Sequence, residues 1–193
     1  GETCWSMGEV RTARRHLEQC LMVYTVEQHH AHAIAYGQHP AVAALATLGI
    51  TLWLLGDVDQ AVQRSQEAIA LARRVAHPFS EAYALCYAAI LHQLRGDREA
   101  MDERTAAAIA LATEHGFAYW LAQAMILRGW FLIDHDRAAE GLALIQQGQT
   151  ALSATGANIG RPHWLMGLAE AQKKLNQREE AQATLASALA VAN

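Results

Sequence analysis

Apolar residues recur every three or four positions through most of this chain, in segments of about fifteen residues that end at short polar turns. In the segment 41–55 the spaced apolar residues are Val42, Leu45, Leu48, Leu52 and Leu55. This spacing places them on one face of an α-helix. Comparable segments predict helices over 59–75, 80–94, 99–114, 118–133, 139–153, 162–175 and 179–192. No alternating apolar and polar run of four or more residues remains outside the predicted helices, so we predict an all-α chain.

The predicted helices come in pairs that repeat every 40 residues. Three rows of small residues keep this interval: Gly49, Ala89, Gly129 and Ala169; Ala68, Ala108, Gly148 and Ala188; and Ala61, Met101, Gly141 and Ala181, with Met101 as a larger member. The turns inside the pairs keep it too, at Gly56, Gly96, Asp136 and Asn176. A fixed interval of this size is typical of stacked helical repeats, in which small residues let helices approach closely.

The interval divides the chain into a single repeat domain, 1–193. We expect a half repeat over 1–27, an expanded connector over 28–40, and full repeats over 41–79, 80–117, 118–160 and 161–193. The half repeat and the apolar last helix leave two ends without polar caps, which such arrays need to stay soluble. We therefore expect either a piece of a longer protein or a homo-oligomer formed through these ends.

The repeat resembles the tetratricopeptide repeat (TPR). The resemblance is carried by the small-residue rows, by the segment 54–61, and by a Leu or Met four residues before the first row, at Leu45, Leu85, Met125 and Leu165. It implies an α-α superhelix, a TPR-like solenoid that binds a protein or peptide and carries no catalytic apparatus. The chain departs from the family in its longer unit, since TPR units have about 34 residues, and at Met101, Arg128 and Gln149.

Three segments, 52–56, 77–80 and 126–130, are similar to a narrower group of helical repeats. These repeats lie on the C-terminal side of large bacterial signalling proteins, after an ATPase module and a nucleotide-cyclase or DNA-binding module. This resemblance implies a regulatory region that senses or docks a regulator in the bacterial cytoplasm.

In TPR arrays the first helix of each pair lines a concave groove, so the resemblance also implies a binding surface. The residues expected there are Ile50, Trp53, Tyr83, Cys86, Ile90, Gln93, Gln123, Ile126, Trp130, His163, Met166 and Glu170. Most are apolar or aromatic, and apolar grooves with polar rims commonly mark interaction sites. In the alternative interpretation, Trp53 and Trp130 only pack into seams between helices.

The expanded connector is rich in histidine, with His29, His30 and His32 close together and His39 nearby. Imidazole is a common ligand of transition metals, so an alternative function is a metal or small-ligand sensor. No cysteine or carboxylate spacing completes a structural zinc motif around these residues. We therefore predict no metal site and no cofactor, and keep the three histidines as the candidates of that alternative.

Composition limits the other function classes. Of the 193 residues 52% are hydrophobic and only 18% charged, against about 25% charged in an average soluble protein. This deficit suggests apolar surface that a partner covers. The net charge of −4 gives no basic field for nucleic acid or anionic lipid.

Three cysteines without a paired spacing fit a reducing, cytoplasmic setting. No membrane-length apolar run occurs. Motifs for phosphate, dinucleotide or zinc-protease chemistry, and the nucleophile elbow, are also missing, so we predict no enzyme.

Overall fold

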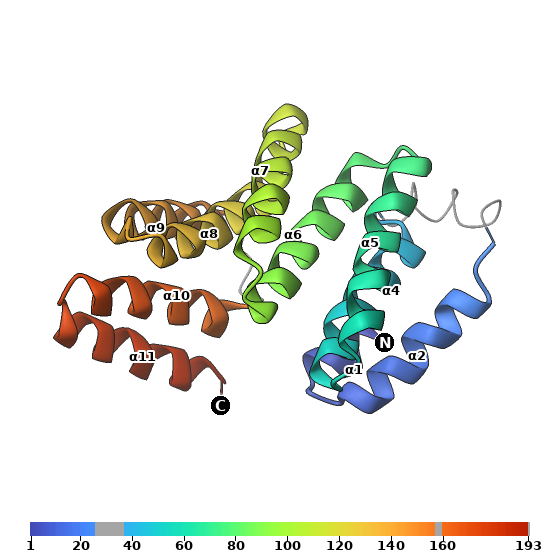
Figure 1. The fold of residues 1–193 in the computed structure, drawn as a ribbon, viewed down its shortest axis with the longest axis horizontal. Helices are drawn as coiled ribbons and strands as arrows, with labels where there is room; N and C mark the ends of the chain where they lie inside the picture. The colour runs from blue at the N-terminus through green and yellow to red at the C-terminus, as the bar shows by residue number, and fades with distance from the viewer. Residues whose placement is uncertain (26–36, 157–159, 193) are drawn as a thin grey trace. The chain divides into compact units, whose positions relative to one another are not determined.

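The computed structural model describes residues 1–25, 37–156 and 160–192, and over these residues it contains helices and no strand (Figure 1). The helices are α1 Glu2–Ser6, α2 Val10–Met22, α4 Pro40–Leu54, α5 Val58–Arg74, α6 Pro78–Arg95, α7 Arg98–His115, α8 Ala118–Asp134, α9 Ala138–Ala154, α10 Arg161–Lys174 and α11 Arg178–Ala192. The all-α prediction is confirmed. Each of the eight helices predicted after residue 40 is present, and its ends lie within two residues of those predicted.

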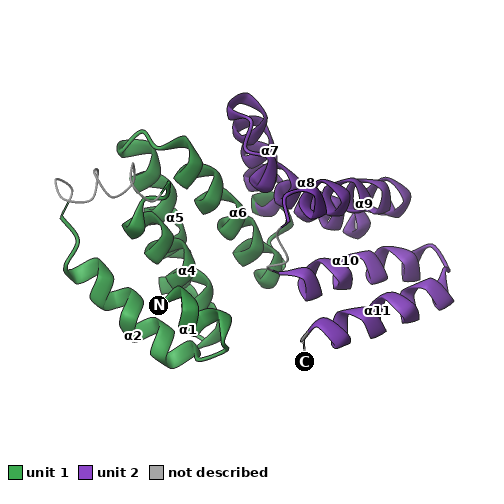
Figure 2. Cartoon of the chain, turned by 180° about the vertical axis from the view of Figure 1, so that it is seen from behind, with its two compact units in different colours: residues 1–100 green, residues 101–193 purple. Residues whose placement is uncertain are grey.

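The chain forms two compact units, residues 1–100 and 101–193 (Figure 2). In unit 1, α1 pairs with α2, α4 pairs with α5, and α6 packs against both members of the α4–α5 hairpin. In unit 2, α8 pairs with α9, α10 pairs with α11, and α10 packs against both members of the α8–α9 hairpin. The same packing therefore occurs in both units: α6 lies against both helices of the α4–α5 hairpin, and α10 lies against both helices of the α8–α9 hairpin.

The turns inside the hairpins use left-handed backbone at the predicted interval. Gly56, Gly96, Asp136 and Asn176 have φ values of 88°, 70°, 58° and 61°. Glycine adopts this conformation without steric penalty, and Asp and Asn are the side chains that tolerate it best. A second row, not predicted from the sequence, lies after α5, α7 and α9, at Ala76, Gly116 and Gly156, with φ values of 50°, 70° and 76°.

The rows of small residues lie where the two helices of a hairpin touch. A Cβ added to Gly129 in α8 would lie 2.7 Å from the carbonyl oxygen of Gly141 in α9. A Cβ added to Gly141 would lie 2.5 Å from the carbonyl oxygen of Gly129. In unit 1 the corresponding distance from Gly49 to the Ala61 carbonyl oxygen is 3.1 Å. The prediction that small residues allow this close approach is confirmed.

Each unit has its own apolar core, because each hairpin buries one face of both helices. The core of unit 1 includes Leu17, Leu48, Leu52 and Leu91, and that of unit 2 includes Ile126, Ile133, Ile145, Leu152 and Trp164. Burying one such side chain stabilises the fold by about 1.5–3 kcal/mol.

The residues that depart from the repeat pattern are accommodated locally. Met101 is buried, the Arg128 guanidinium lies 2.6 Å from Asp102 Oδ1, and Gln149 Nε2 donates to the Trp164 carbonyl oxygen at 3.5 Å.

Candidate functional site

The structure divides the twelve predicted groove residues by their exposure. Five are buried: Ile50, Tyr83, Cys86, Gln123 and Ile126. The others reach the surface at least in part: Trp53, Ile90, Gln93, Trp130, His163, Met166 and Glu170. A ligand can touch only the second group without rearranging the fold, and the binding role of that group stays a prediction.

In unit 1 the predicted residue Tyr83 belongs to a buried packing network. The Tyr83 ring stacks on Tyr87, with centroids 4.3 Å apart, and its hydroxyl lies 2.9 Å from Thr47 Oγ1. The same hydroxyl donates to Glu2 Oε1 at 3.3 Å. Burial raises the pKa of both tyrosines. Burial also raises the pKa of the Cys86 thiol to about 12, so this thiol stays protonated and is a poor nucleophile at neutral pH.

In unit 2 two predicted residues, His163 and Glu170, meet the indole of Trp130. Its Nε1 donates to Glu170 Oε2 at 2.7 Å, and its ring centroid lies 4.8 Å from that of His163. A Cβ added to Gly167 would lie 2.9 Å from an indole carbon. His163, Gly167 and Glu170 are spaced four and three residues apart, so they lie on one face of α10, and that face contacts the indole. The tryptophan of α8 is therefore fixed in orientation by the next hairpin.

His163 is neutral in this setting. Burial lowers the pKa of its imidazole from 6.5 to about 4, because the surrounding apolar groups do not solvate a charge. At pH 7 the ring therefore contacts Trp130 as an uncharged aromatic group.

Beside this cluster, unit 2 has an open pocket of about 630 Å³. It is lined by Trp130, Met166, Ala169, Glu170, Lys173, Arg178, Ala181, Gln182 and Leu185. Three of these residues, Trp130, Met166 and Glu170, belong to the predicted groove set. The α11 members were missed because the resemblance pointed to first helices alone. The available signal was the run of apolar residues at the end of α11, where Leu185 and Leu189 are 46% and 67% exposed.

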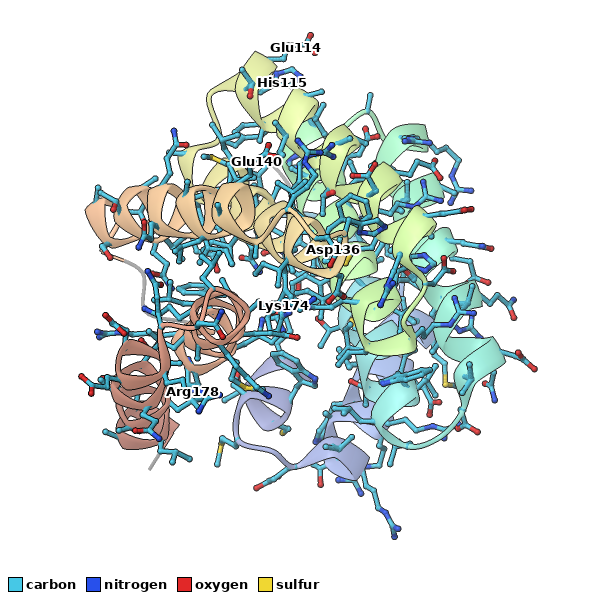
Figure 3. All side chains as sticks on the ribbon, turned by 60° about the vertical axis from the view of Figure 1, so that its left-hand side comes forward. Glu114, His115, Asp136, Glu140, Lys174 and Arg178 are labelled. Carbon is cyan, nitrogen blue, oxygen red and sulfur yellow. The ribbon has the colours of Figure 1, made fainter. Side chains whose placement is uncertain are left out.

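The turn end of these hairpins carries charged side chains, of which Asp136, Glu140, Lys174 and Arg178 are labelled in Figure 3. Lys174 Nζ donates to the Ile133 carbonyl oxygen at 2.8 Å and lies 3.7 Å from Asp134 Oδ1. It thereby binds the C-terminal end of α8, where the helix dipole favours a cation. Arg137 pairs with Glu140 at 2.6 Å, beside a second hollow of about 510 Å³. The Lys174 contacts join α10 to the hairpin before it, whereas the Arg137–Glu140 pair lies within the start of α9.

The histidine alternative cannot be placed, because His29, His30 and His32 lie outside the described residues. His39 is buried, and its Nε2 lies 3.3 Å from the Tyr24 hydroxyl. Within residues 1–25, 37–156 and 160–192, no group of three or more His, Cys, Asp or Glu side chains is arranged to hold a metal ion. Over the same ranges, no helix has the length and hydropathy to cross a bilayer.

Comparisons with known proteins address the fold. No family model matches the chain, and no curated protein matches its sequence. Among solved structures, nearly identical TPR-like repeats of a kinesin light chain-like protein from Podosopora anserina align over 98% of this chain and 90% of that one, with a TM-score of 0.53 and 20% identity. A single-substitution variant of those repeats aligns over the same shares, with a TM-score of 0.54 and 19% identity.

The chain has a TPR-like fold. The alignment over almost the whole chain, the helix pairs and the absence of strands among the described residues agree on this point. Stacked repeats of this kind present extended surfaces on which partners bind. The TPR-like architecture thus makes the exposed helix surfaces of each unit the places to look for a site, and the Trp130 pocket combines such a surface with a fixed aromatic side chain.

Proposed function

We propose that this chain is a non-catalytic binding module that holds a segment of a protein partner in the pocket beside Trp130. The observation that carries the proposal is the exposure of two large apolar walls: Met166 and Leu185 are 51% and 46% exposed in this pocket. Exposed apolar surface with a polar rim commonly marks an interaction site. Glu170, Lys173 and Arg178 provide that rim.

The pocket is large enough to take side chains of a partner segment. Its volume of about 630 Å³ lies within the range of about 300–1,000 Å³ that is usual for ligand pockets. Tryptophan is among the residues that most often dominate binding energy. The hydrogen bond to Glu170 holds the Trp130 indole in place before binding, so little side-chain entropy is lost when a partner docks.

The test is selection of binders from a displayed peptide library on the full chain, followed by measurement of their affinity for two variants. Leu185→Asp places a charge in the pocket. Leu54→Asp is the matched control, because Leu54 is 54% exposed but does not line the pocket. We expect Leu185→Asp to weaken binding about tenfold or more and Leu54→Asp to leave it unchanged. Equal affinity for both variants, with circular dichroism showing both folded, would refute the proposal.

The cellular setting is a further part of the proposal. The resemblance of segments 52–56, 77–80 and 126–130 to regulatory repeats supports a sensing or docking role within a larger, cytoplasmic bacterial signalling protein. In such a protein, the bound partner would alter the output of a module elsewhere in the polypeptide. The coding sequence on either side of this segment tests this: a cyclase, ATPase or DNA-binding module is expected, and an unrelated secreted or membrane context would contradict it.

A further inference from the structure

In unit 2, the groove between the two helices of one hairpin is filled by another helix of the same chain. The helix α10 lies in the groove of the α8–α9 hairpin, where Trp164, Leu168 and Ala171 join the core formed by the hairpin. Gly167 of α10 lies against Trp130. Lys174, the last residue of α10, reaches the carbonyl oxygen of Ile133 near the end of α8. The two first helices therefore run in the same direction, and the occupant of the groove is an amphipathic helix.

The α10–α11 hairpin repeats the α8–α9 hairpin forty residues later. Met166 and Leu185 occupy the positions that Ile126 and Ile145 occupy in the earlier hairpin. Ile126 and Ile145 are fully buried, whereas Met166 and Leu185 are about half exposed and line the pocket. The pocket is thus the same groove in the next hairpin, with its apolar positions open to solvent.

The two grooves differ in charge at the turn end of the hairpin. Lys173 and Arg178 stand at the positions of Ile133 and Ala138, and both line the pocket. Neither has an ion-pair partner among the residues that the structure describes. The adjacent Glu179 and Glu180 do not line the pocket. The groove therefore combines apolar walls with two cations at its turn end, one helical turn beyond the Glu170 carboxylate that accepts from Trp130.

We propose that this groove binds an amphipathic helix of a partner protein, placed as α10 is placed in the α8–α9 groove. The helix presents apolar side chains to Met166 and Leu185. Its last turn carries Asp or Glu opposite Lys173 and Arg178, where the negative end of the helix dipole also favours the two cations. This inference rests on the proposed function and specifies the partner: a helix with an apolar face and an acidic C-terminal turn, in place of an extended peptide.

Two fluorescent peptides test the inference on the full chain by anisotropy. Both copy residues 161–174 and carry Glu170→Gln, which removes repulsion from the Glu170 of the pocket, and both are stapled on the outer face so that a short peptide stays helical. The acidic peptide also carries Lys173→Glu and Lys174→Glu, while the basic peptide keeps both lysines. We expect the acidic peptide to bind about tenfold more tightly, because two partly exposed ion pairs replace two repulsions.

Changes in the protein supply the controls. The double variant Lys173→Glu with Arg178→Glu should reverse the order of the two peptides, and Leu185→Asp should weaken both. No binding of the acidic peptide, or equal binding of the two peptides, would overturn the inference. Unchanged affinity of an acidic peptide that also carries Leu168→Pro would overturn the inference as well, because that peptide cannot form the helix.

The remaining outcomes separate this inference from the proposed function. If library peptides lose affinity for Leu185→Asp but the acidic peptide shows no preference, the pocket binds segments of another kind and only the helical partner is wrong. Sedimentation identifies a different occupant: a dimer that Leu185→Asp converts to monomer would make a second copy of the chain the occupant. A monomer at the concentrations used for anisotropy agrees with a separate partner.

Discussion

The indole Nε1 of Trp130 donates a hydrogen bond to Oε2 of Glu170, 2.7 Å away and forty residues later in the chain. The two residues hold the same position in successive repeats, one in α8 and the other in α10. Their contact joins two hairpins at the edge of the pocket. One interaction therefore contributes both to the stability of unit 2 and to the orientation of the aromatic side chain that we propose as a binding anchor.

Removal of the acceptor should destabilise the protein. Glu170→Ala leaves the partly buried indole N–H without its partner and should lower the free energy of unfolding by about 1 kcal/mol. Glu170→Gln keeps a neutral acceptor and should lower it by less, since a charged acceptor makes the stronger bond. Urea unfolding at pH 7 measures both variants. The exposed Glu179→Ala is the control, and a loss in Glu179→Ala as large as that in Glu170→Ala would contradict the assignment.

His163 should make stability depend on pH between about 4 and 6.5. Its pKa is about 4 in the folded state and about 6.5 when unfolded. Between these values the unfolded chain binds more protons, so stability rises with pH and is lost as pH falls. One pKa unit corresponds to about 1.4 kcal/mol. Because the ring is partly exposed and solvent screens its charge, we expect a contribution of about 2 kcal/mol, which is less than the full pKa difference would give.

The variant His163→Gln isolates this effect, because Gln123 already occupies the same position in the preceding repeat. Between pH 6.5 and 4.5, chemical unfolding should show a smaller loss of stability for His163→Gln than for the natural protein. The exposed His115→Gln should keep the natural profile. Parallel profiles for the natural protein and His163→Gln would show that the imidazole does not titrate as inferred.

The close contact between Gly129 and Gly141 should make Gly129→Ala destabilising, although alanine normally favours a helix. An alanine in a helix is normally about 1 kcal/mol more favourable than glycine. In Gly129→Ala the new Cβ would lie 2.7 Å from the backbone oxygen of Gly141, and overpacking of this kind costs about 1–3 kcal/mol. Gly49→Ala meets its nearest atom at 3.1 Å and should cost less. Thermal unfolding measures the order, and a Gly129→Ala protein more stable than the natural one would show that the helices can separate freely.

Ala76 holds a position that favours glycine. Its φ of 50° is left-handed, while Gly116 and Gly156 take the same conformation at the corresponding turns. This conformation costs a side-chain-bearing residue about 1–2 kcal/mol, partly offset by the greater flexibility of an unfolded glycine. Ala76→Gly should therefore raise the free energy of unfolding by about 0.5–1 kcal/mol. Ala70→Gly, on the exposed face of α5, should instead lower it by about 1 kcal/mol. Loss of stability in both variants would contradict the left-handed turn.

The candidate site could be predicted only in part. Trp130, Met166 and Glu170 were expected at a binding surface because the first helices of TPR arrays line a groove, and the pocket includes them. Tyr83 and Cys86 were expected there on the same grounds but are buried in unit 1. Helical spacing gives the direction of a side chain around its own helix, but it does not state whether a neighbouring helix covers that side chain.

The sequence by itself determined the helices, the turns and the lines of contact within each hairpin. These depend on local properties: apolar spacing of three and four, left-handed turns at residues such as Gly56 and Asn176, and small residues such as Gly129 where backbones meet. Only the tertiary structure decided where the pocket lies. Ile126 and Met166 occupy the same repeat position and are both apolar, yet Ile126 is buried under α10, whereas Met166 is 51% exposed and lines the pocket. Coverage is a property of the packed neighbours, and no single segment of sequence encodes it.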